Sequence, residues 1–340
     1  MAPWFFQLTG CQDGVYHASD CINFGRRAGE ISGLQQIAVN FYSEGCRLQG
    51  LLRLPDGPGP FPGIVQGPGW LGLHDAKLYE RYHASFTDAG YAVLVFDYRG
   101  FGDSEGERGL ILPMHQTQDI RNAITYLQTR SEVHPGRIGL FGSGGTGGAN
   151  PIYVAAVDER VKCVVSNYAF ASGRAWLRSM RREYEWLEFL KRLEADRKRR
   201  VLEGKGEMVS PREELMVATP ERKQTTVKKD VDGRIPEQVP LRCAEAIMEF
   251  CPEDWVARIS PRAIMFISTE NDAVTPEDQT FLLYEKAGEP KKLILQKETS
   301  HYKAYDDYFD QVTPQIVDWY DRHLKYDKVE TWESGNTSCC

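Results

Sequence analysis

Short apolar runs alternate with helical patterns over most of the chain, and this rhythm predicts a mostly parallel β-sheet with helices on both faces. The first two runs, 36–43 and 47–54, alternate apolar and polar residues around a turn at Glu44-Gly45, as half-buried strands of a hairpin do. Later runs are continuously apolar, which is typical of strands covered on both faces. These runs are 63–66, 91–96, 137–141, 161–165, 263–267 and 292–295.

Between these strands, apolar residues recur every three or four positions, and we therefore expect helices there. The turn residue Gly90 ends the first of these segments. The expected helices are 78–89, 115–130, 147–157, 276–287 and 305–324.

The rhythm breaks near residue 172 and resumes at 259, which predicts a helical cap inserted into an α/β core. Residues 174–203 are highly charged, with apolar residues at helical spacing from Trp176 to Leu193, so we expect one long helix with a single apolar stripe. A polar, loop-rich stretch and a shorter helix follow. The predicted parts are an N-terminal arm (1–34), a core (35–171 and 259–326), the cap (172–258) and a flexible C-terminal tail (327–340).

Composition excludes several classes of protein. With 340 residues, 41% of them hydrophobic and 26% charged, the chain can bury a sizeable core, which rules out a disordered chain. The formal net charge of −7 argues against nucleic acid as a partner. No apolar run approaches the roughly 20 residues of a membrane span, and the N-terminus lacks the pattern of a signal peptide, so we expect no membrane association.

The eight cysteines form no CxxC pair and have no histidine at zinc-ligand spacing, so we expect neither a metal nor a cofactor. Scattered free thiols favour a reducing compartment, here the cytoplasm. The terminal Cys339-Cys340 pair lacks the polybasic support of a prenylation signal and fits a disordered tail better.

Three loops that could carry chemistry follow predicted strands. The first is 67–72 (GPGWLG), and the second is 142–148 (GSGGTGG), between a strand and a helix. The third element is the pair Asp272 and His301, each just after a later strand. Because ligands of open α/β sheets bind at the carboxyl ends of the strands, we expect a site there. The glycine-rich loop lacks the lysine of a phosphate-binding P-loop, which argues against nucleotide binding.

These segments resemble the α/β-hydrolase superfamily, in the branch of X-Pro dipeptidyl peptidases, dienelactone-hydrolase-like proteins and fungal polyketide hydrolases or transferases. Residues 97–106 resemble that branch's D-x-R-G-x-G-x-S-x-G segment, 270–276 its acid loop and 300–305 its histidine loop. The chain order of elbow, acid and histidine also agrees. The resemblance spans residues 36–325 and implies an α/β-hydrolase fold with hydrolase activity. In the 97–106 segment we expect Asp97 and Arg99 to tie loops together without a catalytic role.

The strand–turn–helix elbow departs from the family pattern. A G-x-S-x-G motif places the nucleophilic serine at the apex of the turn, and the count from Gly142 puts Gly144 at that position. The nucleophile is then missing. In the alternative register Ser143 occupies the apex, but Phe141 then stands where the first tight-turn glycine belongs.

A site without a nucleophilic serine can still catalyse reactions. His301 can act as a general base, with Asp272 fixing its tautomer and stabilising its imidazolium form. Backbone N–H groups of Gly145 and of Gly69 or a neighbour are candidates for an oxyanion hole. The leading hypothesis is proton abstraction beside a carbonyl, or water activation, serving hydrolysis, C–C bond cleavage or cyclisation. An esterase, thioesterase or acyltransferase that uses Ser143 is one alternative, and a non-enzymatic ligand-binding homologue is another.

The expected substrate is a small molecule with a carbonyl group. The site loops carry few charges, and Trp70 and Trp176 are candidate pocket walls, so a hydrophobic substrate fits better than a phosphorylated one. His74 lies near the first loop and is a candidate substrate contact, although a surface histidine is the commoner case. The amphipathic cap helix could pack on the core or mediate a homodimer.

Overall fold

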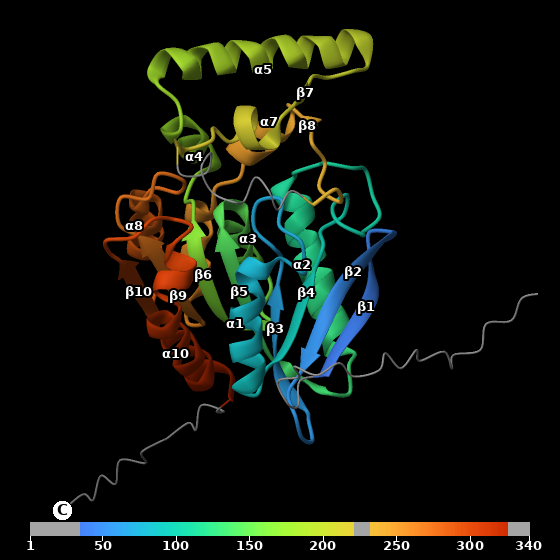
Figure 1. The fold of residues 1–340 in the computed structure, drawn as a ribbon, viewed down its shortest axis with the longest axis vertical. Helices are drawn as coiled ribbons and strands as arrows, with labels where there is room; N and C mark the ends of the chain where they lie inside the picture. The colour runs from blue at the N-terminus through green and yellow to red at the C-terminus, as the bar shows by residue number, and fades with distance from the viewer. Residues whose placement is uncertain (1–34, 221–231, 326–340) are drawn as a thin grey trace, which may run out of the picture. The chain divides into compact units, whose positions relative to one another are not determined.

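The computed structural model describes residues 35–220 and 232–325, and its centre is an eight-stranded sheet (Figure 1). β1 and β2 pair antiparallel, β2 and β4 pair antiparallel, and the remaining neighbours pair parallel. The mostly parallel sheet is therefore confirmed. In spatial order the strands are β1 (Gln35–Ser43), β2 (Cys46–Leu54), β4 (Ala92–Phe96), β3 (Phe61–Gln66), β5 (Val133–Gly144), β6 (Val161–Ala169), β9 (Ala263–Thr269) and β10 (Lys291–Gln296).

The predicted hairpin is present, and its turn is where the sequence places it. Ser43 pairs with Cys46, so Glu44 and Gly45 form a two-residue connection. Both have left-handed backbone, with φ of 48° and 81°, which matches the right-handed twist of the flanking strands. In the centre of the sheet all five residues of β4 are buried, as its continuously apolar sequence predicts.

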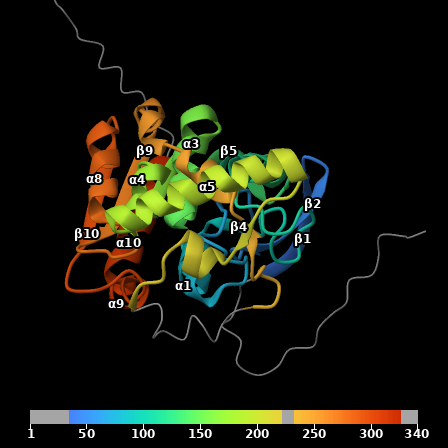
Figure 2. The ribbon, with the colours of Figure 1, turned by 90° about the horizontal axis from the view of Figure 1, so that it is seen from above.

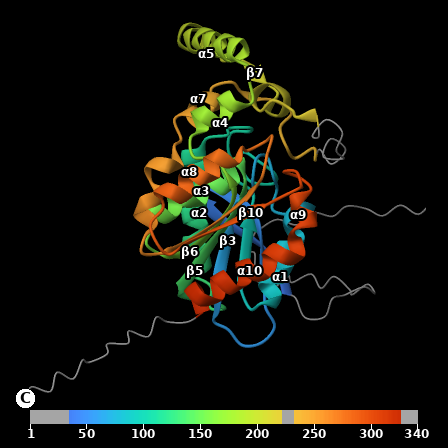
Figure 3. The ribbon, with the colours of Figure 1, turned by 90° about the vertical axis from the view of Figure 1, so that its left-hand side faces the viewer.

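Helices cover both faces of the sheet, and each layer encloses its own apolar core (Figure 3). One face is covered by α1 (Lys77–Asp88) and α10 (Phe309–Tyr320). The other face is covered by α2 (Pro113–Gln128), α3 (Gly145–Val157) and α8 (Glu277–Lys286).

The closing segment, predicted as one helix over 305–324, is interrupted. It consists of the short helix α9 (Ala304–Asp307), then α10, then the turn η5 (Asp321–Lys325). The break lies at Tyr308, whose hydroxyl binds the backbone of Lys297 and ties the segment to the loop after β10.

The cap is inserted between β6 and β9 and lies beyond the carboxyl ends of the parallel strands (Figures 1 and 2). Its last turns, which follow α7, pack against α3 and α8 of the core. Its elements are α4 (Gly173–Ser179), α5 (Glu183–Glu203), β7 (Met208–Val209), η1 (Pro211–Leu215), β8 (Val239–Pro240), α7 (Cys243–Met248), η3 (Pro252–Asp254) and η4 (Val256–Ile259).

The prediction of one continuous helix over 174–203 is wrong, because the chain breaks between α4 and α5. The carboxylate of Glu185 accepts the backbone N–H of Arg182 at 2.7 Å and caps the start of α5. The Arg181 guanidinium binds carbonyls of Leu177 in α4 and of Leu215 in η1. These bonds satisfy the polar groups that a helix break exposes.

The break also changes which residues of the cap are buried. On α5 the buried apolar residues are Trp186, Phe189 and Leu193. Tyr184 and Leu187, which the single-stripe pattern assigns to the buried face, are 57% and 50% exposed. An apolar pattern that runs without interruption from α4 into α5 therefore does not mark one continuous buried face.

Several sequence predictions fall outside the described residues: the N-terminal arm, the tail 327–340 and the cysteines at 11, 21, 339 and 340. The four described cysteines, Cys46, Cys163, Cys243 and Cys251, are free thiols. Among the described helices, none combines the length and apolar character needed to cross a membrane.

Candidate active site

The acid and the histidine predicted from the sequence lie in contact, although 28 residues separate them in the chain. Asp272 follows β9 and His301 follows β10, and these strands are neighbours in the sheet. His301 Nδ1 lies 2.7 Å from Asp272 Oδ2, and both side chains are almost fully buried. The backbone N–H groups of Val274 and Thr275 donate to Asp272 Oδ1. The carboxylate thus orients the imidazole with its Nδ1–H directed at Oδ2, which leaves Nε2 with a free lone pair.

The sharp turn between β5 and α3 is centred on Gly144. β5 ends at this residue and α3 begins at Gly145, with φ of 76° and 41°. A Cβ atom on Gly142 would lie 2.2 Å from the Gly147 carbonyl oxygen and 2.3 Å from the Pro151 ring, so only glycine fits there. At Gly144 the nearest non-neighbouring atom would be 3.6 Å away, so there is room for a side chain.

Ser143 lies on the strand beside this turn, and its side chain is fully buried. It pairs with Asn167 of β6 in the sheet register. Its hydroxyl lies 2.6 Å from the Tyr305 hydroxyl and accepts a bond from Asn167 Nδ2 at 3.2 Å. The hydrogen-bond partners of Ser143 are therefore Tyr305 and Asn167, whereas the partner of His301 is Asp272.

The first loop packs directly on the elbow at Gly69. A Cβ atom at this position would lie 2.4 Å from the Ser143 carbonyl oxygen and 2.8 Å from the Tyr79 hydroxyl. The Gly69 N–H, which the sequence offers as an oxyanion donor, contacts the hydroxyl of Tyr79. The other candidate donor, Gly145 N–H, stands at the start of α3, where N–H groups have no intrahelical partner.

Both tryptophans singled out in the sequence lie at the elbow. Ring atoms of Trp176 would be 3.1 and 3.2 Å from a Cβ on Gly145. The Trp176 indole N–H donates to the Val274 carbonyl in the acid loop, and its ring meets Trp70 edge-on at 5.7 Å. Trp176 is fully buried and contacts all three loops.

Two buried tyrosines lie against His301 and a third packs on one of them, and the sequence pattern did not identify them as site residues. The Tyr168 and Tyr305 rings lie 4.8 and 6.2 Å from the imidazole, and Tyr79 meets Tyr305 at 6.1 Å. Burial raises the pKa of Tyr79 to about 12 and raises the pKa of Tyr168 and Tyr305 well above the ordinary value, so their hydroxyls remain protonated at neutral pH. Tyr79 lies on a predicted helix and Tyr305 follows the histidine motif, but only the tertiary fold brings them together.

Backbone strain is concentrated in the segments that form the site. Leu71 in the first loop, Tyr168 at the end of β6 and Asn271 before Asp272 all have left-handed backbone, with φ of 55–56°. Such conformations of non-glycine residues cost about 1–3 kcal/mol each and are concentrated at functional sites. Their positions agree with the location of the candidate site.

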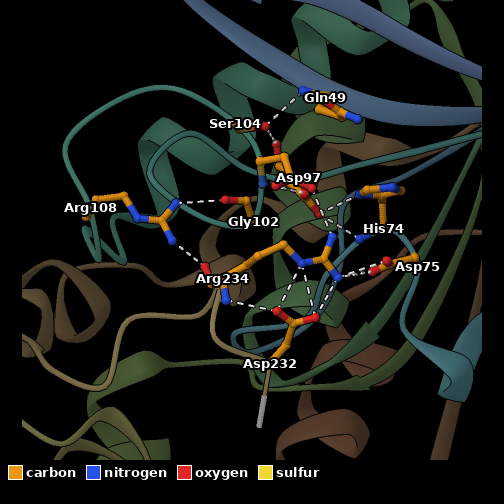
Figure 4. A network of polar contacts seen from close by, with 10 residues as sticks. Gln49, His74, Asp75, Asp97, Gly102, Ser104, Arg108, Asp232 and Arg234 are labelled. Atoms are coloured by element: carbon orange, nitrogen blue, oxygen red, sulfur yellow. Dashed lines mark hydrogen bonds and ion pairs between the residues drawn. The ribbon is translucent and has the colours of Figure 1, made fainter. Parts of the chain in front are cut away.

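Asp97 ties three segments together, as predicted from the sequence motif (Figure 4). Its carboxylate accepts the backbone N–H groups of His74 at 2.7 Å and Asp103 at 3.1 Å, and its carbonyl accepts the Ser104 hydroxyl. Arg99 likewise pairs with buried Asp119. The motif therefore holds the loops that surround the site.

The same network determines the position of His74. Its Nδ1 lies 3.0 Å from Asp97 Oδ1. Burial alone would lower the pKa of His74, but the hydrogen bond and the charge of Asp97 outweigh it and raise the pKa above its ordinary value. His74 is thus directed at Asp97 rather than at His301.

Arg234 joins the cap to this network (Figure 4). Its guanidinium pairs with Asp75 at 2.9 Å, with Asp103 at 3.0 Å and with Asp232 at 2.6 Å. The Arg234 hydrogen bonds lower the pKa of Asp232 to about 2. The backbone carbonyl of Arg234 also accepts a bond from Arg108. These pairs connect the cap to the core loops at 75 and 103.

Within the described ranges, no group of three or more His, Cys, Asp or Glu side chains is arranged to hold a metal ion.

The mostly parallel sheet, the strand–elbow–helix and the acid and histidine after later strands define an α/β-hydrolase. Solved structures agree with this fold. The hypothetical protein PA2218 from Pseudomonas aeruginosa superimposes with a TM-score of 0.75 at 23% identity, covering 86% of this chain and 95% of that one. The α/β-hydrolase GrgF from Penicillium sp. sh18 superimposes with a TM-score of 0.72 at 22% identity, covering 86% and 100%.

The chain belongs to the X-Pro dipeptidyl-peptidase (S15) family, whose profile matches residues 44–303. An uncharacterized 31.7 kDa protein of Escherichia coli, from the traX-finO intergenic region, is 31% identical over 83% of this chain and 97% of its own length. The quorum-quenching protein AidA of Acinetobacter baumannii is 28% identical over 84% and 94%. The thiohydrolase apmlB of Arthrinium phaeospermum is 37% identical over 36% and 39%.

Proposed function

We propose that this α/β-hydrolase-family protein is an enzyme that acts on a hydrophobic, carbonyl-containing small molecule without a serine nucleophile. His301 is its general base, and Asp272 orients His301. The observation that carries the proposal is the combination of a buried His301–Asp272 pair with a glycine at the elbow. A protein that only binds a ligand has no need of such a pair, whereas a base needs it.

The position of the serine also supports this proposal over one in which Ser143 is the nucleophile. A nucleophilic serine donates its proton to the catalytic histidine. The Ser143 hydroxyl instead lies against Tyr305 and Asn167 and is fully buried. The tight approach at Gly142 likewise supports the register in which Gly144 occupies the apex.

For hydrolysis, His301 Nε2 takes a proton from a water molecule as the water oxygen attacks the substrate carbonyl carbon. The carbonyl oxygen becomes an oxyanion, and N–H donors at the elbow such as Gly145 stabilise it. The tetrahedral species then expels its leaving group, which takes the proton back from His301. Asp272 stays ionised throughout and stabilises the imidazolium. For ring closure, His301 takes a proton beside the carbonyl, the enolate carbon attacks a second carbonyl carbon of the substrate, and the new alkoxide takes the proton back. For C–C cleavage, the base takes the proton of a β-hydroxyl group, the C–C bond breaks to give a carbonyl and an enolate, and the enolate carbon takes the proton back.

Aromatic groups at the elbow support a hydrophobic substrate. Trp70, Trp176 and Phe170 form a stacked and edge-on group beside it. The name thiohydrolase, borne by a relative of part of the chain, makes a thioester a reasonable first probe. We therefore propose activated esters, thioesters and lactones as the substrate class to be tested.

The test measures turnover of 4-nitrophenyl butyrate, a butyryl thioester and a δ-lactone by the wild-type protein, His301→Ala and Ser143→Ala. We expect His301→Ala to abolish turnover and Ser143→Ala to keep most of it. Asp278→Asn, an exposed acid on α8, is the matched control for a change outside the site.

Loss of turnover in Ser143→Ala, or labelling of Ser143 by a fluorophosphonate, would establish the serine esterase instead. Turnover by His301→Ala at the wild-type rate would exclude the general-base mechanism. Binding of a substrate-like ligand with the same affinity by all three proteins, with no turnover by any of them, would favour the ligand-binding homologue.

A further inference from the structure

We propose that Tyr79 and Tyr305 are further catalytic residues, which together present a hydrogen-bond donor to an oxygen atom in the space beside Gly144. This inference rests on the proposed function, because that function leaves the space free for a substrate oxygen or a water. It assigns to two tyrosines the part of the site that a serine side chain occupies in a serine hydrolase.

The two hydroxyls belong to a buried polar cluster at the site. The Tyr79 hydroxyl lies against Gly69, where a Cβ atom would be 2.8 Å from it, and the Tyr79 ring packs edge-on against that of Tyr305. The Tyr305 hydroxyl lies 2.6 Å from the Ser143 hydroxyl, which also accepts a bond from Asn167 Nδ2. The three hydroxyls therefore lie together beside the elbow.

The hydroxyl hydrogens of Tyr79 and Tyr305 can turn towards an oxygen atom placed beside them, because a hydroxyl rotates to suit its acceptor. Either atom can donate in the contact between Ser143 and Tyr305, so Tyr305 can give its hydrogen to such an oxygen while Ser143 donates to Tyr305.

The space at Gly144 can bring an oxygen atom to these hydroxyls. A Cβ atom built on Gly144 would lie 3.6 Å from the Tyr305 hydroxyl oxygen and 3.8 Å from that of Tyr79, and these are its nearest atoms apart from chain neighbours. An oxygen one bond further out comes within hydrogen-bonding reach of either hydroxyl. Glycine at this position opens the space, and the two tyrosines border it.

The burial of the tyrosines suits them to donate and not to ionise. Desolvation raises the pKa of both hydroxyls, so they keep their hydrogens while a carbonyl oxygen gains negative charge. A fixed donor in a dry site stabilises such charge strongly, and loss of one typically costs about 10²–10³-fold in rate.

The two hydroxyls border the same space, which predicts how the variants behave together. In Tyr79→Phe the Tyr305 hydroxyl remains beside Gly144, and in Tyr305→Phe the Tyr79 hydroxyl remains there. Each single variant therefore keeps a tyrosine donor, and we expect less than about a 10-fold loss in kcat/KM. The double variant keeps none, and we expect a loss of about 10²–10³-fold. A purely structural role of the hydroxyls does not predict such a synergy.

A chemical probe tests the inference without a known substrate. In Gly144→Cys the new thiol occupies the space beside the hydroxyls, and donors to its sulfur stabilise the thiolate and lower its pKa. The rate of alkylation by iodoacetamide is followed against pH by mass spectrometry of the tryptic peptide 138–160, which contains no native cysteine. In the Gly144→Cys background, we expect Tyr79→Phe with Tyr305→Phe to raise the thiol pKa by one unit or more. This rise corresponds to about a 10-fold loss of thiolate at neutral pH.

One further variant in the same background serves as the control. Tyr82→Phe removes a buried hydroxyl on the same helix that donates to the Tyr305 backbone carbonyl, and we expect no change. An unchanged thiol pKa in the double tyrosine variant would overturn the inference and leave the His301–Asp272 mechanism standing. Conversely, wild-type turnover in His301→Ala would overturn the proposed function, while the thiol result would still report on the tyrosines. If the double variant does not fold, the single variants decide. Each removes one of two donors to the thiolate, so we expect a smaller rise in the thiol pKa, and a rise in neither variant contradicts the inference.

Discussion

At the scale of single residues, the carboxylate of Asp272 is the most fully used polar group of the candidate site. One of its oxygens faces the imidazole of His301, and the other accepts two backbone N–H groups. Bonds to an ionised acceptor are roughly twice as strong as neutral ones. Because all of these donors are buried, any side chain that replaces Asp272 leaves at least one of them without a suitable acceptor.

Replacement of Asp272 by asparagine should therefore impair the base more than the fold. The amide has one acceptor atom for two sets of donors, so either His301 takes the wrong tautomer or the backbone N–H groups lose their acceptor. We expect a fall of about 10²–10⁴-fold in kcat and a loss of about 1–3 kcal/mol in stability. Steady-state kinetics and urea unfolding measure the two effects. Wild-type kcat in this variant would contradict the role of Asp272.

His74 makes a pH-dependent contribution to stability. Its pKa is raised in the folded protein, so the contribution is complete below its ordinary pKa of about 6.5 and is lost as pH rises through the folded pKa. We expect His74→Gln to lower Tm at about pH 5.5 and to approach the wild-type Tm at about pH 9. Thermal unfolding of both proteins across this range is the measurement. A Tm difference that grows with pH would show the sign to be wrong.

At the scale of elements, close backbone approach explains the glycines of the β5–α3 junction. A Cβ atom on Gly147 would lie 2.5 Å from Gly69 Cα, and one on Gly148 would lie 2.5 Å from the Asn167 carbonyl oxygen. The first turn of α3 thus packs against β6 and the first loop at distances that only glycine permits. The run of glycines in the sequence predicts an elbow, but only these contacts show which of the glycines the packing requires.

Two alanine substitutions separate the roles of these glycines. Gly142→Ala places a methyl group 2.2 Å from the Gly147 carbonyl oxygen, so the backbone must move, and we expect a loss of about 2–3 kcal/mol. Gly144→Ala meets no atom closer than 3.6 Å and has only the strain of its positive φ, about 1 kcal/mol. Urea unfolding of the two variants gives the comparison. If Gly144→Ala were the less stable of the two variants, the apex of the β5–α3 turn would lie elsewhere.

At the scale of the whole molecule, the cap is held to the core by charge and apolar packing and still has apolar side chains facing solvent. Arg234 pairs with Asp75 and Asp103 of the core. On α5, by contrast, Tyr184, Leu187, Val201 and Leu202 are 50–82% exposed. Exposed apolar residues on one helix favour a second protein surface over solvent. A homodimer through the cap therefore remains our prediction for the assembly.

This prediction is tested by the mass of the protein in solution. We expect the wild type to sediment at about twice the 38.6 kDa of the chain. Tyr184→Lys with Leu187→Lys adds charge to the exposed side of α5 and should yield the monomer. Met114→Lys, an equally exposed apolar residue on α2, is the control and should leave the mass unchanged. A monomeric wild type would exclude the dimer at the concentration used.

Local pattern alone determined the strands, most helices, the hairpin turn at Glu44-Gly45 and the positions of Asp272 and His301 after their strands. These features depend on periodicity and on residues close together in the chain. The break between α4 and α5 depends on more distant groups, such as the bonds from Arg181 to carbonyls in η1, and local periodicity cannot show it.

The arrangement around Gly144 was decided by the tertiary structure. The sequence predicts that a glycine stands where the family has its serine, but it does not show what borders that glycine. Tyr79 and Tyr305, 226 positions apart, meet there because α1 and the histidine loop pack on the same face of the sheet. Side chains that meet across such a separation leave no local periodicity, so only the packed fold identifies them as neighbours.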